Sequence, residues 1–152
     1  MKLTALVITS LLILTSCQTF QDSLNLEKIQ PFTSDGCSMS PNGPRAKPNG
    51  FLECCVNHDL AYWQGGTLEQ KQTADLALQA CITENSNEKI GKVFYEAVSL
   101  GGGPQFNTSF RWGYGWPKRR TYEALNHTER KSVEQELQNI RWHEIYTSLK
   151  SE

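Results

Sequence analysis

The spacing of two cysteines about one double glycine limits this fold more than any other feature. The segment 51–64 carries Cys54, lacks glycine and proline, and favours a helix. Glycines 65–66 end it, and a second helix, carrying Cys81, is expected from 68 to about 82. If the glycines make a tight turn, the helices are antiparallel, and Cys54 and Cys81 lie at nearly equal distances from that turn. The hairpin therefore allows a bond between them.

The same hairpin aligns residues that can carry chemistry. Thr67 and Gln70 have the spacing of a capping box, which independently indicates that the second helix starts after the glycines. His58 and Tyr62 are four residues apart and share one helix face. Asp75, on the second helix, comes level with His58. A neutral histidine held by a carboxylate is oriented as a general base for water.

A loop rich in glycine and proline, residues 35–50, precedes the first helix and contains Cys37. Pairing of Cys37 with Cys55 would bring Asp35 close to Asp59. Asp59 and Asp35 with the carbonyl of Gly36 would form a hard oxygen site suited to Ca²⁺, which could polarise an ester carbonyl. Four cysteines allow three connectivities, and the sequence alone does not choose among them.

The motif Cys-Cys-x-x-His-Asp-x-x-Tyr at 54–62, with Asp75 six residues before Cys81, resembles the active-site hairpin of the secreted phospholipase A2 superfamily. The loop 35–38, Asp-Gly-Cys-Ser, is more similar to the bacterial branch of that superfamily. The match covers about residues 32–82. It implies a mainly α fold with a disulfide-linked antiparallel helical hairpin, and calcium-dependent hydrolysis of the sn-2 acyl ester of glycerophospholipids.

The resemblance also implies the role of each matched residue. His58 would be the base, Asp75 its partner, and Tyr62 a hydrogen-bond donor to Asp75. No residue is matched to the family's second tyrosine partner of that aspartate. The implied Ca²⁺ ligands are Asp59, Asp35 and the Gly36 carbonyl, and the implied disulfides are Cys37–Cys55 and Cys54–Cys81.

The fifth cysteine, Cys17, follows a segment typical of secretion signals. Residues 1–16 contain Lys2, an apolar stretch too short to span a bilayer, and then small residues. Leu-Thr-Ser-Cys at 14–17 resembles the lipobox of bacterial lipoproteins, whose cysteine is acylated. The resemblance to these lipoproteins also implies sorting to the outer membrane, because the residue after the cysteine is Gln18 and not Asp. We therefore expect a lipid-anchored envelope protein with a tether at 17–31 and one domain at 32–152.

Composition excludes some alternatives. There are 15 Lys and Arg residues against 16 Asp and Glu, so no excess of positive charge favours nucleic-acid binding. A zinc site is disfavoured because no second pair of cysteine or histidine ligands accompanies Cys54 and His58. His127 and His143 are expected in solvent. The main rival is a catalytically silent lipoprotein that keeps the hairpin as a scaffold for binding lipid or protein.

The rest of the chain carries no motif from the family. A third helix is expected over 90–100, and a final amphipathic helix over 129–149. Between them, the loop 106–120 is rich in aromatic residues and ends in the basic run 118–120. Its aromatic side chains could form a membrane-interface patch, but packing onto the domain is favoured, because large aromatic side chains usually supply buried area.

The lipobox leads to a first prediction. The protein purified from bacterial membranes should begin at Cys17 with acyl groups attached, and Cys17→Ser should abolish both lipid attachment and membrane retention. Mass spectrometry of the N-terminal peptide checks this. An unmodified Cys17 in the mature protein would contradict the prediction.

Overall fold

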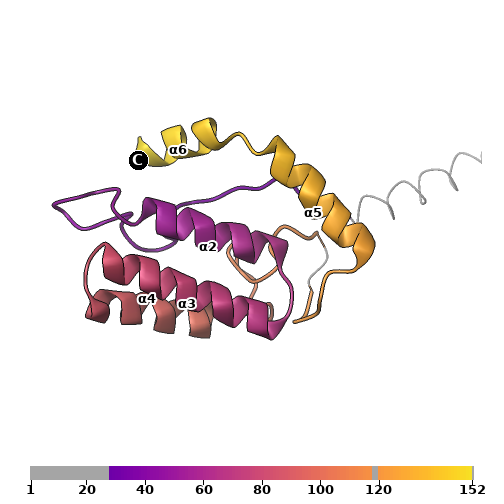
Figure 1. Ribbon diagram of the computed structural model, residues 1–152, viewed down its shortest axis with the longest axis horizontal. Coiled ribbons are helices and arrows are strands. Elements are labelled where there is room, and N and C mark those ends of the chain that lie inside the picture. The colour runs from indigo at the N-terminus through magenta and orange to yellow at the C-terminus, as the bar shows by residue number, and fades with distance from the viewer. Residues whose placement is uncertain (1–27, 118–119, 152) are drawn as a thin grey trace, which may run out of the picture.

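The computed structural model describes residues 28–117 and 120–151, so the expected signal segment and Cys17 lie outside the described part. Within it the chain is mainly α-helical, as predicted, with five helices and no β-strand (Figure 1). None of these helices combines the length and apolar character needed to cross a bilayer. The helices are α2 (Leu52–Gln64), α3 (Leu68–Glu84), α4 (Glu88–Gly101), α5 (His127–Asn139) and α6 (Trp142–Lys150).

Helices α2 and α3 form the predicted antiparallel hairpin (Figure 1). The capping box is present: Thr67 Oγ1 accepts from the Gln70 backbone N–H, and the Gln70 side chain accepts from the Thr67 backbone N–H. Gly65 and Gly66 both have positive φ, 70° and 137°, which explains why the turn needs glycine. The disulfides are Cys54–Cys81, far from the turn, and Cys37–Cys55, which attaches the preceding loop. Both implied pairings are confirmed.

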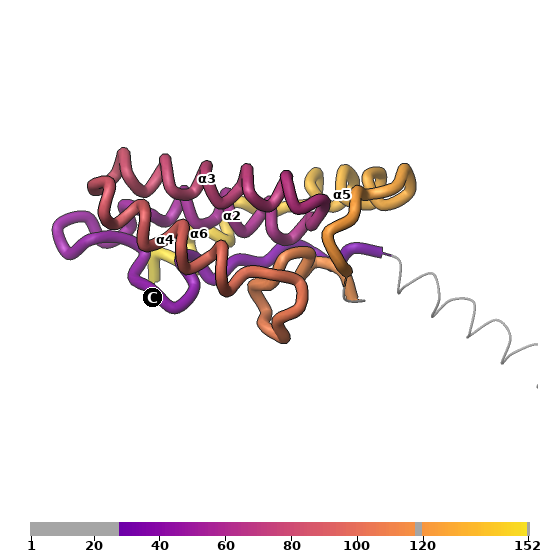
Figure 2. Tube along the Cα trace, turned by 90° about the horizontal axis from the view of Figure 1, so that it is seen from below, coloured from indigo at the N-terminus to yellow at the C-terminus, as the bar shows by residue number. Residues whose placement is uncertain are grey.

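Helix α4 packs along α3 because a glycine faces the contact (Figure 2). A Cβ added at Gly91 would lie 2.0 Å from Thr83 Oγ1 and 2.8 Å from the carbonyl oxygen of Gln79. The two backbones are therefore closer than any larger residue permits. Helix α4 also contacts the start of α2, where the ring of Phe94 lies edge to face with that of Phe51 at 5.7 Å.

The prediction of a single helix over residues 129–149 is wrong. The chain forms α5 and α6, separated by Ile140 in an extended conformation. Ile140 and Ile145 are five residues apart, a spacing that breaks the helical phase of the earlier apolar positions. The break lets both helices bury apolar residues in one core, Val133 from α5 and Leu149 from α6.

The sequence predicts that the domain begins at residue 32, but residues before this position already pack against the core. Ile29 is 1% exposed and belongs to the same core as Trp63 of α2. The indole Nε1 of Trp63 donates to the carbonyl of Gln30, whose own N–H donates to the carbonyl of Gly115. Buried apolar area and paired main-chain groups therefore hold this segment in the fold.

The close approach of α3 and α4 leads to a second prediction. Gly91→Ala should lower the free energy of unfolding by about 1–3 kcal/mol, because the new methyl group has no room. Gly101→Ala, at the end of the same helix, should leave it unchanged or raise it by up to about 1 kcal/mol, since nothing lies within 4 Å of a Cβ there. Urea denaturation measures both. Equal effects of the two substitutions would refute the tight contact.

Candidate active site

The hairpin brings together His58, Asp75 and Tyr62, as the sequence predicted. His58 Nε2 lies 3.0 Å from Asp75 Oδ1, and the Tyr62 hydroxyl donates to the same oxygen at 2.7 Å. Asp75 is 1% exposed and His58 8% exposed. His58 and Tyr62 are one turn apart on α2, so both point at the single carboxylate on α3.

Sequence analysis missed the remaining partner of Asp75. Lys71, one turn earlier on α3, is buried, and its Nζ donates to Asp75 Oδ2 at 2.7 Å and to the carbonyl of Val98 at 3.1 Å. Tyr62 also donates to that carbonyl, at 3.3 Å. A lysine four residues from an aspartate on a helix is a recognisable ion-pair signal. Such pairs are usually solvent-exposed, and the sequence does not indicate that this one is buried.

The electrostatics favour a neutral histidine beside an ionised aspartate. Burial lowers the pKa of His58, and the Asp75 carboxylate offsets only part of that effect. Burial would raise the pKa of Asp75, but hydrogen bonds from His58, Lys71 and Tyr62, together with the Lys71 charge, hold this pKa below its ordinary value. Since an ionised carboxylate only accepts hydrogen bonds, Nε2 of His58 carries the ring proton and Nδ1 is the basic nitrogen.

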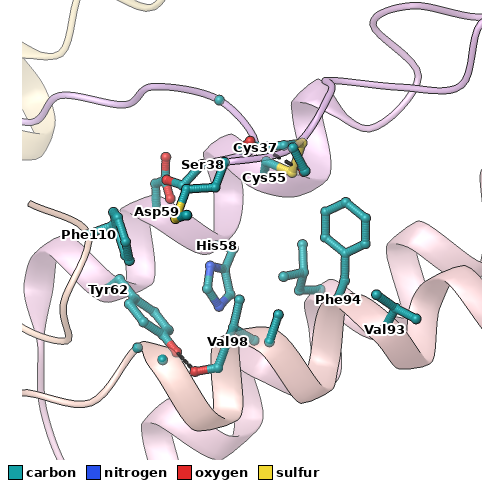
Figure 3. A pocket seen from close by; sticks show the side chains of 17 residues that line it. Cys37, Ser38, Cys55, His58, Asp59, Tyr62, Val93, Phe94, Val98 and Phe110 are labelled. Carbon is teal, nitrogen blue, oxygen red and sulfur yellow. Dashed lines mark hydrogen bonds between the residues drawn. A yellow bond between two sulfur atoms is a disulfide. The ribbon is translucent and has the colours of Figure 1, made fainter. Parts of the chain in front are cut away.

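A cavity of about 430 Å³ lies against His58 (Figure 3). One side is the loop 36–40, and another is α4. The side chains from α4 and several others that line the cavity are apolar: Leu78, Val93, Phe94, Ala97, Val98 and Phe110. The imidazole thus lies in the wall of a mainly apolar cavity that has a few polar groups, including Asp59 and Tyr62, the arrangement expected for a site that binds an apolar ligand next to a reactive group.

The predicted calcium ligands are divided between two neighbouring cavities. Asp35 and Asp59 both line a second cavity of about 240 Å³, whereas Gly36 lines the first; Asp59 lines both. Ser34 Oγ donates to Asp59 Oδ2, and Ser38 Oγ donates to Asp35 Oδ1, each at 2.6 Å. Among residues 28–117 and 120–151, no three His, Cys, Asp or Glu side chains cluster as metal ligands. The predicted site does not need such a cluster, since it uses two carboxylates and a main-chain carbonyl.

Asp59 is a buried carboxylate whose negative charge has no positively charged side chain among the described residues that hydrogen-bond to it. It is 7% exposed, and burial raises its pKa to about 7, with the Asp35 charge adding to the rise and the Ser34 hydrogen bond opposing it. The other residues that line the second cavity all carry a hydroxyl group except Phe110: Thr33, Ser34, Ser109, Tyr114 and Phe110. The donor set is therefore oxygen-rich, as hard cations require.

The aromatic loop packs on the domain, as favoured from the sequence. Trp112 and Trp116 are buried, and their indole Nε1 atoms donate to the carbonyls of Gly66 and Gln64. These carbonyls lie at or just beyond the end of α2, where no further helical turn supplies donors. The loop thus closes the hairpin at its turn. Of the basic run at its end, only Arg120 is described, and it pairs with Glu129.

The histidines expected in solvent, His127 and His143, are exposed, so His58 is the histidine that the fold sets beside a buried carboxylate. The site has a buried dyad, an apolar cavity and a neighbouring oxygen-rich cavity. No protein-family model, curated protein or solved structure matches this chain.

Proposed function

We propose that this protein is a calcium-dependent ester hydrolase of the secreted phospholipase A2 superfamily, cleaving the sn-2 acyl ester of glycerophospholipids. The observation that carries the proposal is the position of His58. Its Nε2 is held by Asp75 while its ring lines the apolar cavity. A general base at the wall of a cavity that accepts an acyl chain suits the hydrolysis of a lipid ester.

In the proposed reaction, Nδ1 of His58 takes a proton from a water molecule as the water oxygen attacks the ester carbonyl carbon. The bond between that carbon and the glycerol oxygen then breaks, and the imidazolium returns the proton to the departing oxygen. The products are a fatty acid and a lysophospholipid. Asp75 stabilises the transient imidazolium and keeps the ring oriented, and Tyr62 holds the carboxylate in place.

The residues around the second cavity fit a calcium ion. Asp59 and Asp35 supply two carboxylates to it, and Asp59 in particular is a desolvated charge that a cation would compensate. The carbonyl of Gly36, next in the chain to Asp35, is the third proposed ligand. When bound, Ca²⁺ would polarise the ester carbonyl and stabilise the developing oxyanion.

The proposed setting is the surface of a bacterial membrane. Acylation of Cys17 would anchor the domain to the envelope, on the outer membrane, where the phospholipid surface is both attachment site and substrate. The alternative function, a catalytically silent scaffold that binds lipid or protein, would have the same anchor and hairpin but would not hydrolyse phospholipid. Activity therefore separates the two functions.

Activity supplies the third prediction. With mixed phospholipid–detergent micelles, the protein should release fatty acid when Ca²⁺ is present and stop on addition of a chelator. His58→Gln should lower kcat by about 10²–10⁴-fold, the usual contribution of a general base. The exposed His143 is the matched control, and His143→Gln should leave kcat unchanged.

Fatty-acid titration with phospholipids of several headgroups measures this release. A folded wild-type protein that binds Ca²⁺ but releases no fatty acid from any headgroup class would support the scaffold function instead. Release that persists in His58→Gln would place the chemistry at another site.

Calcium binding supplies the fourth prediction. Asp59→Asn should weaken Ca²⁺ binding by about tenfold or more, because affinity follows the number of charged ligands, whereas His58→Gln should leave it unchanged. Glu53→Gln removes an exposed carboxylate from the same helix and serves as the control. Isothermal titration calorimetry compares the three variants. Equal weakening in Asp59→Asn and Glu53→Gln would rule out a specific role for Asp59.

A further inference from the structure

Lys71 is a buried charge that the proposed reaction does not use. It is 3% exposed, although lysine is almost never fully buried unless it is paired. Besides its bonds to Asp75 and to the Val98 carbonyl, its Nζ lies 5.3 Å from the centre of the Tyr62 ring. Lys71 lines neither cavity, so it does not reach a bound substrate. Its effect on the reaction has to pass through Asp75.

The charges around Asp75 show what Lys71 contributes. The other hydrogen-bond donors to this carboxylate are His58, Tyr62 and, at 3.5 Å, Ser99. Tyr62 and Ser99 carry no charge, and burial disfavours the charged form of His58. Lys71, in contrast, is a cationic side chain whose Nζ lies 2.7 Å from Asp75 Oδ2. A buried carboxylate without a counter-ion is costly and tends to take up a proton instead.

We propose that Lys71 is the counter-ion that keeps Asp75 ionised, and that it thereby determines which ring nitrogen of His58 is the base. The proposal extends the hydrolytic function given above. An ionised Asp75 can only accept, so Nε2 of His58 must donate and Nδ1 keeps its lone pair. A protonated Asp75 could donate its O–H to Nε2. The ring proton would then move to Nδ1, and the nitrogen that must accept a proton from water would be blocked.

This makes Lys71 a positioning residue, and its test needs a readout that does not depend on turnover. The ¹⁵N chemical shifts of the His58 ring distinguish the Nε2–H form from the Nδ1–H form. They can be recorded on the labelled full-length protein without Ca²⁺ or lipid. Lys71→Met removes the charge and keeps most of the side-chain volume, whereas Lys71→Arg keeps a positive charge.

Another lysine offers a matched control. Lys92 also precedes an acidic residue, Glu96, by four positions on a helix, with 3.8 Å between Nζ and Oε1. Its side chain is 69% exposed, against 3% for Lys71. Exposed pairs of this kind contribute little. Lys92→Met should therefore leave both the His58 spectrum and the activity as in the wild type.

The expected result has two parts. The wild type, Lys92→Met and Lys71→Arg should show His58 in the Nε2–H form, whereas Lys71→Met should shift it substantially toward Nδ1–H. In the micelle assay, Lys71→Met should lower kcat by about 10²–10⁴-fold, because a histidine in the wrong tautomer cannot act as base. Its KM should stay unchanged, since Lys71 does not contact substrate.

A double variant keeps the test decisive if Lys71→Met folds poorly. Asp75→Asn removes the negative charge, so Lys71→Met in that background leaves no unpaired buried charge and should fold at least as well as Lys71→Met alone. If Lys71 acts through Asp75, kcat of the double variant should equal that of Asp75→Asn. An undiminished further loss in that background would overturn the proposal.

The proposal fails separately from the proposed function. An unchanged Nε2–H spectrum in folded Lys71→Met would overturn the role of Lys71, even if the wild type hydrolyses phospholipid. A wild type that releases no fatty acid would refute the hydrolase, while the ring spectra would still decide whether Lys71 determines the tautomer of His58.

Discussion

One buried carboxylate, Asp75, connects the fold and the site. It projects from α3 and receives hydrogen bonds from His58 and Tyr62 on α2, Lys71 on α3 and Ser99 on α4. A charge of this kind is stable in a low-dielectric interior only when its partners are correctly placed. The relative positions of three helices are thus tied to a single group. Changes in packing between these helices will therefore also affect the chemistry of the histidine.

Small residues allow α4 to take part in the site. A Cβ at Gly102, just after α4, would lie 2.5 Å from the Tyr62 hydroxyl, and Gly91 permits the close contact with α3. This proximity lets the carbonyl of Val98 accept from both Tyr62 and Lys71. A main-chain carbonyl cannot be removed by substitution, so this part of the cluster depends on helix position alone. Glycine is usually unfavourable inside a helix, but Gly91, near the start of α4, has a packing function.

The predictable parts of the structure were those governed by local chemistry. The turn after α2, the capping box of α3 and the spacing of Cys54 and Cys81 defined the hairpin, and the hairpin in turn placed Asp75 beside His58. The bend at Ile140 was missed because an overall helical periodicity masked one spacing of five residues. Burial of Lys71 was missed because α4, which covers it, contacts it through a carbonyl that no sequence pattern reveals.

The Cys54–Cys81 bridge gives the hairpin a dependence on its surroundings. Cys54 is one helical turn from His58, and Cys81 is six residues from Asp75, so the covalent link fixes the helices beside the dyad. Disulfides persist in oxidising compartments and are rare where thiols are kept reduced. A newly made chain in a reducing cytosol would lack this link, and its base and carboxylate would be aligned by noncovalent contacts alone. Covalent alignment of His58 with Asp75 therefore depends on an oxidising environment.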